Sequence, residues 1–264
     1  MPISLRLMSM LKSPEDIETM REGGRIHARI LGELSRLAKP GVPTLILEEE
    51  ALRLIREFGC RPAFLNYKPK GARRPFPAAL CVSVNDEIVH GIPNEAERIL
   101  KDGDIASLDL GVVYKGLITD AAVTVPVGAV DDESKELIDT ARRALLAGIE
   151  AAKAGSTIGD IGFAISEVVS KTSFSLAEDL AGHGVGYAVH EEPWVPNVGK
   201  KGEGEKLVSG MVLALEPMVN VGRPGIKTSG DGYTIKTKDG SRSAHFEHTV
   251  AITEGGNIIL TSDD

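Results

Sequence analysis

The chain has few cysteines and no long apolar run, and each of these absences excludes a class of protein. Cys60 and Cys81 are the only cysteines among 264 residues, too few for a disulfide framework, and no Cys-x-x-Cys zinc motif occurs. No apolar run reaches the roughly 18 residues of a transmembrane helix. The opening segment is interrupted by Arg6 and lacks the clean hydrophobic region of a signal peptide. We therefore expect a cytoplasmic protein in a reducing compartment.

An excess of basic charge is also missing. The chain carries 38 acidic and 30 basic residues, and its net charge of −8 argues against non-specific binding to nucleic acid. We expect neither DNA nor a membrane as a partner. The apolar content of 42% and charged content of 26% are ordinary for a globular protein, and the length allows one two-lobed domain or two small domains.

Two pairs of helices are predicted, and strand-like segments follow each pair. Ser13 caps a helix that begins at Pro14 and ends near residue 39, and Thr44 is expected to cap a second helix that reaches about residue 58. The second pair begins at residues 131–133 and at Thr157, and ends near residues 153 and 171. The strand-like segments cover residues 80–84, 88–93, 104–125, 183–190, 211–221, 232–237 and 246–252.

The two halves resemble each other. Residues 38–44 and 152–157 both join a long helix to a shorter one, which suggests duplication of a helix–helix–sheet unit. Helices followed by strands, repeated once, favour an α+β fold over a parallel βαβ fold.

Asp109 and Asp120 lie in two strand-like runs joined by a turn at residues 114–116. A two-residue loop with Val113 opposite Gly116 would place the two aspartates directly opposite each other on one face of the sheet. Two like charges in that position destabilise a sheet unless a cation lies between them. Two alternatives stay open at this point: a metal site, and a solvated hairpin with two surface aspartates.

Three further ionisable residues lie in apolar or glycine-rich segments. His183 is surrounded by small residues, while Glu216 and Glu247 each lie in a run of strand-forming residues. Each alone is ambiguous, since a lone histidine is commonly structural and a glutamate at a strand end commonly points to water. Jointly, two aspartates, two glutamates and one imidazole suit manganese, iron, cobalt or zinc, and four carboxylates would neutralise two divalent cations.

The five residues and their surroundings resemble the methionine aminopeptidase family. The matching motifs are His-Gly-Ile-Pro at 90–93, Gly-His-Gly at 182–184, His-Glu-Glu-Pro at 190–193, Glu-Pro-Met at 216–218 and Glu-His-Thr at 247–249. The resemblance covers residues 13–257. It implies the pita-bread fold, an antiparallel sheet covered by helices with a pseudo-twofold internal repeat. It also implies an enzyme that removes the N-terminal methionine from nascent proteins and peptides with a metal-activated hydroxide.

The resemblance also assigns roles. Asp120 and Glu247 would bridge two divalent metal ions (cobalt, manganese, iron or zinc), Asp109 would bind one ion, and His183 and Glu216 would bind the other. The implied catalytic residues are His90, His190 and Glu216. The implied substrate-binding residues are His90, His190, Phe76, Cys81 and Tyr233.

We expect residues 1–12 to be an N-terminal extension and residues 13–264 to be a single catalytic domain, with halves at about 13–127 and 128–257. The form resembles bacterial type I, because we expect no zinc-finger extension and only 30 residues separate Glu216 from Glu247. The expected partners are N-terminal methionine residues of peptides and nascent chains, and we expect a monomer. For the basic loop at residues 61–74, a transient contact with the ribosome stays open, although a solvated loop is favoured.

Two other classes of protein share parts of this pattern. Prolidases and aminopeptidase P enzymes share the five ligands but usually carry a large N-terminal domain. Non-catalytic binding modules of the same fold typically lose ligands, whereas all five are present here.

Three details depart from the common family pattern: Val189 replaces a bulky aromatic residue, Ser107 replaces an asparagine, and the longer loop leaves the role of Tyr67 open.

Overall fold

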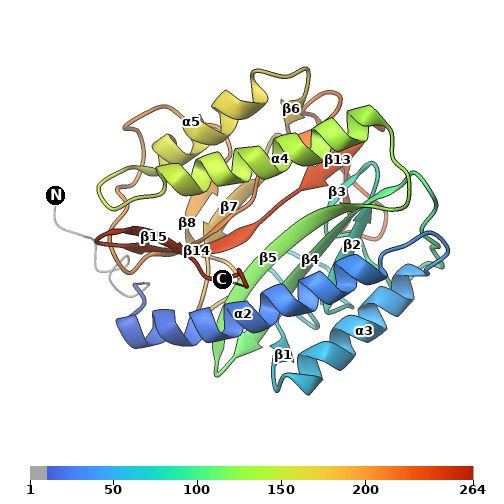
Figure 1. The fold of residues 1–264 in the computed structure, drawn as a ribbon, viewed down its shortest axis with the longest axis horizontal. Coiled ribbons are helices and arrows are strands. Elements are labelled where there is room, and N and C mark those ends of the chain that lie inside the picture. Colours follow the sequence, from blue (N-terminus) through green and yellow to red (C-terminus); the bar gives the residue numbers. More distant parts are fainter. Residues whose placement is uncertain (1–10, 264) are drawn as a thin grey trace.

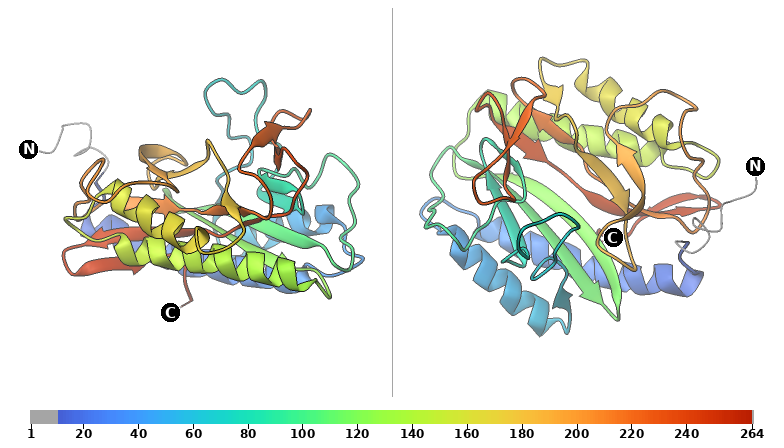
Figure 2. Two further views of the ribbon diagram at one scale, coloured as in Figure 1. Left: turned by 90° about the horizontal axis from the view of Figure 1, so that it is seen from above. Right: turned by 180° about the vertical axis from the view of Figure 1, so that it is seen from behind.

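The structure, a computed structural model, describes residues 11–263. Most of the expected extension, residues 1–10, therefore lies outside the described residues. Within the described part of the chain, four α-helices and fifteen short or long strands form an α+β arrangement, as the sequence predicts. The long helices α2 and α4 lie in front of the sheets in Figure 1, and the view from behind shows strands and loops (Figure 2).

The first helix pair is α2 (Pro14–Leu37) and α3 (Thr44–Glu57). The N-cap predicted at Ser13 is confirmed, and it forms a capping box, because its side chain accepts from the backbone N–H of Asp16 and the Asp16 side chain accepts from the backbone N–H of Ser13. The expected cap at Thr44 is wrong. Pro43 occupies the N-cap position without a side-chain hydrogen bond, and the Thr44 hydroxyl donates instead to the carbonyl of Pro93.

The second helix pair repeats this arrangement with α4 (Asp132–Ala151) and α5 (Ile158–Val169). The side chain of Asp131 caps α4, and Thr157 and Asp160 form a capping box at the start of α5. The α2–α3 pair and the α4–α5 pair lie on opposite sides of the molecule in Figure 1. The predicted helices are therefore confirmed to within about two residues at most of their ends.

The strands form two larger and two smaller antiparallel sheets. In the first large sheet, β4 pairs with β5 along one edge and with β1 and β2 along the other; the second large sheet has the order β15-β14-β9-β7-β8. The small sheets have the orders β13-β10-β6 and β11-β12-β3. Their bounds are β1 (Arg61–Pro62), β2 (Leu80–Val84), β3 (Glu87–Val89), β4 (Ile105–Tyr114), β5 (Leu117–Pro126), β6 (Ser175–Leu176), β7 (Ala181–Gly184), β8 (Glu191–Pro196), β9 (Val212–Leu215), β10 (Met218–Asn220), β11 (Ile226–Thr228), β12 (Ile235–Thr237), β13 (Ser243–His245), β14 (His248–Thr253) and β15 (Gly256–Ile259).

Each helix pair packs its apolar face on strands of its own half. Ile30, Leu34 and Leu47 of the first pair join a buried cluster with strands β2 and β4, and Leu137 and Ile161 of the second pair join another with β9 and β14. No helix within residues 11–263 is long and apolar enough to cross a membrane. Because helices cover one side of the strands, polar residues on the other side are free to line a pocket.

Candidate metal centre and substrate pocket

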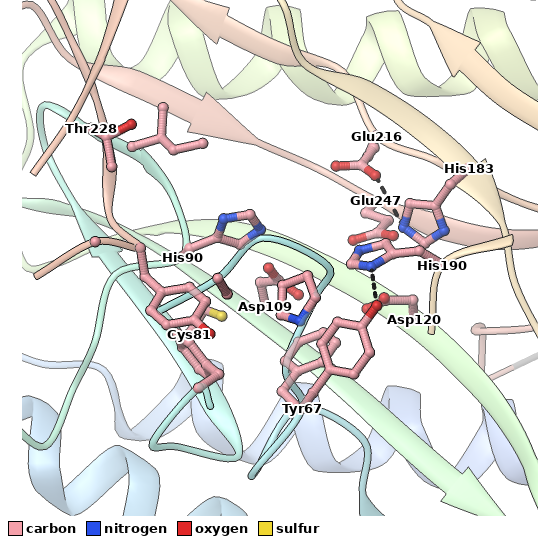
Figure 3. A pocket seen from close by; sticks show the side chains of 17 residues that line it. Tyr67, Cys81, His90, Asp109, Asp120, His183, His190, Glu216, Thr228 and Glu247 are labelled. Carbon is pink, nitrogen blue, oxygen red and sulfur yellow. Dashed lines mark hydrogen bonds and ion pairs between the residues drawn. The ribbon is translucent and has the colours of Figure 1, made fainter. Parts of the chain in front are cut away.

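One pocket contains every side chain to which the sequence assigns a role (Figure 3). Its volume is about 260 Å³. The residues assigned in advance that line it are Phe76, Cys81, His90, Asp109, Asp120, His183, His190, Glu216, Tyr233 and Glu247. They come from strands and loops of both halves of the chain, so the fold brings together residues up to 171 positions apart, from Phe76 to Glu247.

The carboxylates lie in a row that crosses neighbouring strands. Cys81 is paired with Asp109, Asp109 with Ala122, and Ala122 with Glu247 through an isolated bridge between the two large sheets. The β9–β14 and β10–β13 ladders have the same register, with Leu215 opposite His248 and Met218 opposite His245, which places Glu216 opposite Glu247. Directly opposed residues share a sheet face, so this row projects toward one side.

The side chains of Asp120 and His183 point to the same face as this row, because side chains alternate along a strand. Asp120 is two residues from Ala122, and His183 is paired with Ala214, which is two residues from Glu216. Residues two apart on a strand point to the same face. The backbone register alone therefore directs all five predicted ligands toward the same pocket.

The predicted register of the β4–β5 hairpin is wrong. Asp109 is opposite Ala122, and Asp120 is opposite Gly111, because the loop consists of Lys115 and Gly116 alone. Both loop residues have positive φ values, 47° and 89°, as a tight two-residue hairpin requires. The aspartates are thus diagonal neighbours on one face rather than directly opposed, at a typical separation of about 7–8 Å between such positions.

Three of the carboxylates are buried and, within residues 11–263, lack a hydrogen-bond partner for one of their oxygens. Asp109, Asp120 and Glu247 are at most 6% exposed, and one oxygen of each has no hydrogen-bond partner among the described residues. Burial raises the pKa of Asp109 to about 7 and that of Glu216 to about 8. Burial, and then repulsion from neighbouring carboxylates, raises the pKa of Asp120 and of Glu247 well above the usual range. Unpaired buried carboxylates of this kind fit divalent cations, which would supply the missing positive charge.

Two groups of side chains have donor atoms close enough to share a cation. One group is Asp120, His183 and Glu247, and the other is Glu216, His245 and Glu247; in each, the donor atoms lie within 4.8 Å of one another. Asp109 lines the same pocket but belongs to neither group. Glu247 is common to both groups, which fits the predicted bridging position.

The proton on His183 is placed by its backbone. Its Nδ1 atom lies 2.9 Å from the carbonyl oxygen of Gly184, and a carbonyl can only accept, so Nδ1 carries the proton. Nε2 then presents its lone pair, 3.4 Å from Oε1 of Glu216. Burial lowers the pKa of His183 to about 3, so the ring is neutral near pH 7. A neutral imidazole with a fixed tautomer is the form that binds a metal ion.

An apolar wall lies beside these polar groups. The rings of Phe76 and Tyr233 are 5.2 Å apart in an edge-to-face arrangement, and the Tyr233 hydroxyl donates to the carbonyl of Arg74. Cys81 is buried, and burial raises the pKa of its thiol well above the usual value, so it contributes an uncharged surface. Phe64 also lines the pocket.

Two histidines, His90 and His190, line the same pocket as the carboxylates (Figure 3). His190 lies with its ring centroid 4.5 Å from that of His183, and its Nδ1 is 2.9 Å from the hydroxyl of Tyr67. His90 has a left-handed backbone with φ of 61°, which is uncommon outside glycine and frequent at functional sites. Burial lowers the pKa of His90 to about 4 and also lowers the pKa of His190.

A family model described as metallopeptidase family M24 matches residues 18–254, nearly the whole chain. The chain belongs to metallopeptidase family M24. Among curated relatives, the methionine aminopeptidase of Aquifex aeolicus is 45% identical over 95% of this chain and 98% of its own length. Methionine aminopeptidase 1 of Bacillus subtilis is 44% identical over 96% of this chain and 99% of its own length.

Similar solved structures confirm the fold. The methionine aminopeptidase of Thermotoga maritima superposes with a TM-score of 0.90 at 42% identity, covering 96% of this chain and 98% of that one. The prolidase of Pyrococcus furiosus superposes with a TM-score of 0.76 at 21% identity, covering 98% of this chain but 67% of that one. The pita-bread fold implied by the sequence motifs is therefore the fold of this M24 member.

Two residues of this M24 site were not assigned by the sequence. Tyr67, whose role was left open, lines the pocket and contacts His190. His245 was overlooked, although it is 1% exposed and lies 3.5 Å from Glu216 and 3.8 Å from Glu247. Strand alternation was the available signal, because counting two residues back from Glu247 reaches His245 on the same face.

Proposed function

We propose that this chain removes the N-terminal methionine from peptides and nascent proteins by metal-dependent hydrolysis of the first peptide bond. The observation that carries the proposal is a cluster of four carboxylates, three of them buried, and one buried imidazole beside an apolar wall, within one pocket. The cluster suits cations, and the wall suits an unbranched apolar side chain. Relatives named methionine aminopeptidase, at 44–45% identity over nearly their full length, support the choice of substrate.

The proposed cation-binding residues are Asp109, Asp120, His183, Glu216 and Glu247. Four carboxylates and a neutral imidazole balance the charge of two divalent ions, and oxygen-rich sets with one imidazole suit cobalt, manganese, iron or zinc. When bound, such ions polarise a carbonyl and lower the pKa of water. The unpaired oxygens of Asp109, Asp120 and Glu247 support this number of ions, because one cation would leave two excess negative charges in a buried site.

The proposed substrate contacts follow from the lining of the pocket. Phe76, Cys81 and Tyr233 would pack against the methionine side chain, since all three present uncharged surface. His90 and His190 would contact the peptide unit to be cleaved, because they are neutral, polar and line the same pocket as the carboxylates. With the Tyr67 hydroxyl as donor to Nδ1, His190 keeps its proton on Nε2, where it can stabilise a developing oxyanion.

Glu216 is the proposed proton carrier. It lines the same pocket as His90 and His190, the histidines proposed to contact the peptide unit to be cleaved. In the hydrolysis, water oxygen adds to the carbonyl carbon, Glu216 accepts a proton from water, and the C–N bond breaks as that proton passes to the leaving amine. His183 beside it stays neutral and does not compete for this proton.

A peptide assay tests the proposal. We expect metal-free protein to be inactive on Met-Ala-Ser, to gain activity when cobalt, manganese, iron or zinc is added, and to release free methionine. Ala-Pro peptides are the control for prolidase-like activity, and we expect no cleavage. Cleavage of Ala-Pro but not of Met-Ala-Ser would favour the prolidase group. No cleavage of either peptide with any of the four ions would favour a non-catalytic binding module.

Several expectations from the sequence stay proposals. These are a monomeric state, a cytoplasmic location, a single catalytic domain with two pseudo-symmetric halves, and a transient contact of the basic loop with the ribosome. In the structure, Lys68, Lys70 and Arg73 of that loop are exposed, whereas Arg74 is paired with Glu95. The exposed lysines are compatible with either a ribosome contact or a solvated loop.

A further inference from the structure

His245 is a buried histidine whose polar atoms are left without partners. Its side chain is 1% exposed, and neither ring nitrogen has a hydrogen-bond partner among the described residues. A buried imidazole normally forms at least one hydrogen bond, because desolvation of an unpaired nitrogen is unfavourable. The ring is not among the residues that line the substrate pocket, so a direct contact with a peptide is not its role.

The backbone holds His245 against two predicted metal ligands. It ends β13, opposite Met218, and its backbone N–H donates to the Thr124 hydroxyl, which in turn donates to the His245 carbonyl. Nε2 is consequently fixed 3.5 Å from Oε2 of Glu216 and 3.8 Å from Oε2 of Glu247. These separations are slightly longer than a hydrogen bond, so a small movement of the glutamate would complete one.

His183 and His245 face different oxygens of Glu216, and only the tautomer of His183 is fixed by a hydrogen bond among the described residues. The Gly184 carbonyl holds the proton of His183 on Nδ1, which leaves Nε2 as a lone pair facing Oε1 of Glu216. Two lone pairs facing each other favour a cation between them. Within residues 11–263 no carbonyl constrains His245 in this way, so its proton is able to occupy Nε2 and point toward Oε2 of Glu216.

We propose that His245 is a positioning residue that donates a hydrogen bond from Nε2 to Oε2 of Glu216 and thereby orients Oε1 toward a divalent cation. This inference rests on the metal site of the proposed function. Partners behind a ligand typically change metal affinity about 10–100-fold when they are removed, because they fix the orientation of the ligand and raise its basicity. His245 fixes the orientation of the Glu216 carboxylate in the same way that the Gly184 carbonyl fixes the orientation of the His183 ring.

Three variants of the full chain test this role. His245→Leu removes the donor, His245→Gln keeps an N–H donor on a side chain of similar reach, and His248→Leu is the matched control. His248 lies on the next strand and bonds to Thr261 rather than to a carboxylate. Cobalt(II) is titrated by calorimetry into each chelator-treated protein, and the visible spectrum of the cobalt-loaded protein is recorded.

We expect His245→Leu to weaken one cobalt-binding step about 10–100-fold and to alter the cobalt spectrum. His245→Gln is expected to recover affinity to within about threefold of the native protein, and His248→Leu to match it. If the leucine variant does not fold, His245→Asn replaces it, because the shorter amide cannot reach Glu216.

Two results would overturn the positioning role. Native affinity and spectrum in the leucine variant would make His245 a packing residue. Loss of one bound cobalt in both the leucine and glutamine variants would make His245 a direct ligand. Failure of the native protein to bind any cobalt, manganese, iron or zinc would instead refute the metal site of the proposed function, so the two failures are distinguishable.

Discussion

Removing one charge from the carboxylate cluster is expected to stabilise the protein when no metal is bound. Burial, with the nearby Glu216 carboxylate, raises the pKa of Asp109 to about 7 from its ordinary value of 3.8. Between these pH values the unfolded chain has lost the proton, whereas the folded chain still holds it. The folded state therefore binds more protons, and the free energy of unfolding falls as the pH rises.

The magnitude follows from the size of this pKa difference. Each pKa unit corresponds to about 1.4 kcal/mol, so the raised pKa of Asp109 lowers the free energy of unfolding by about 4 kcal/mol at pH 8 and by about 2 kcal/mol at pH 5. Asp109→Asn removes this charge but leaves a buried amide that costs about 1 kcal/mol. We expect the variant to gain about 3 kcal/mol in the free energy of unfolding at pH 8 and about 1 kcal/mol at pH 5.

Urea unfolding of the chelator-treated native protein and variant measures the change in the free energy of unfolding at pH 5 and at pH 8. Asp239→Asn is the control, since hydrogen bonds from Arg223 and Ser241 lower the pKa of Asp239 to about 2. That carboxylate is ionised in both states at pH 5 and at pH 8, so its loss should lower stability by the same amount at each pH. A metal-free native protein that is equally stable at pH 5 and pH 8, or an Asp109→Asn variant less stable than native at pH 8, would refute the reasoning.

Two further substitutions test the pocket and the core. Tyr67→Phe removes the hydroxyl 2.9 Å from Nδ1 of His190 and should lower kcat/KM about 2–10-fold in the peptide assay, with cobalt affinity unchanged; an unchanged kcat/KM would contradict a role for this contact. Gly24→Ala would place a methyl group 2.0 Å from the backbone oxygen of Leu260 and should lower the free energy of unfolding by about 2–3 kcal/mol in urea. Gly32→Ala, on the same helix with its nearest atom 3.8 Å away, should raise it by about 0.5–1 kcal/mol, and an equal loss in both variants would contradict the steric argument.

The helices are predictable from sequence because their signals are local. Ser13 and Thr157, where helices are expected to begin, each lie three residues before an aspartate, and both form a capping box with it. Thr44 shows where this reasoning fails. It has the right residue type for an N-cap, but its hydroxyl finds a distant partner, the carbonyl of Pro93, which no local pattern reveals.

The face on which Asp109 and Asp120 lie is also predictable, although their pairing is not. The register expected from the turn differs from the observed one by two positions on a single strand. Because side chains alternate with a period of two, an even shift keeps both aspartates on the same face. The conclusion that they share a site therefore survives an error in the hairpin, whereas a shift by one residue would have separated them.

No local sequence pattern predicts that Glu216 and Glu247 lie opposite each other. The β9–β14 and β10–β13 ladders share one register, but the pairing is interrupted at Glu216 and Pro217, where proline has no N–H to donate. A strand pattern in the sequence shows that each glutamate lies among apolar residues; it does not show which strand lies opposite. At the same interruption, Glu247 and His245 are buried with polar atoms that have no hydrogen-bond partner among the described residues, so the feature that hides the site from sequence reasoning also makes it suitable for cations.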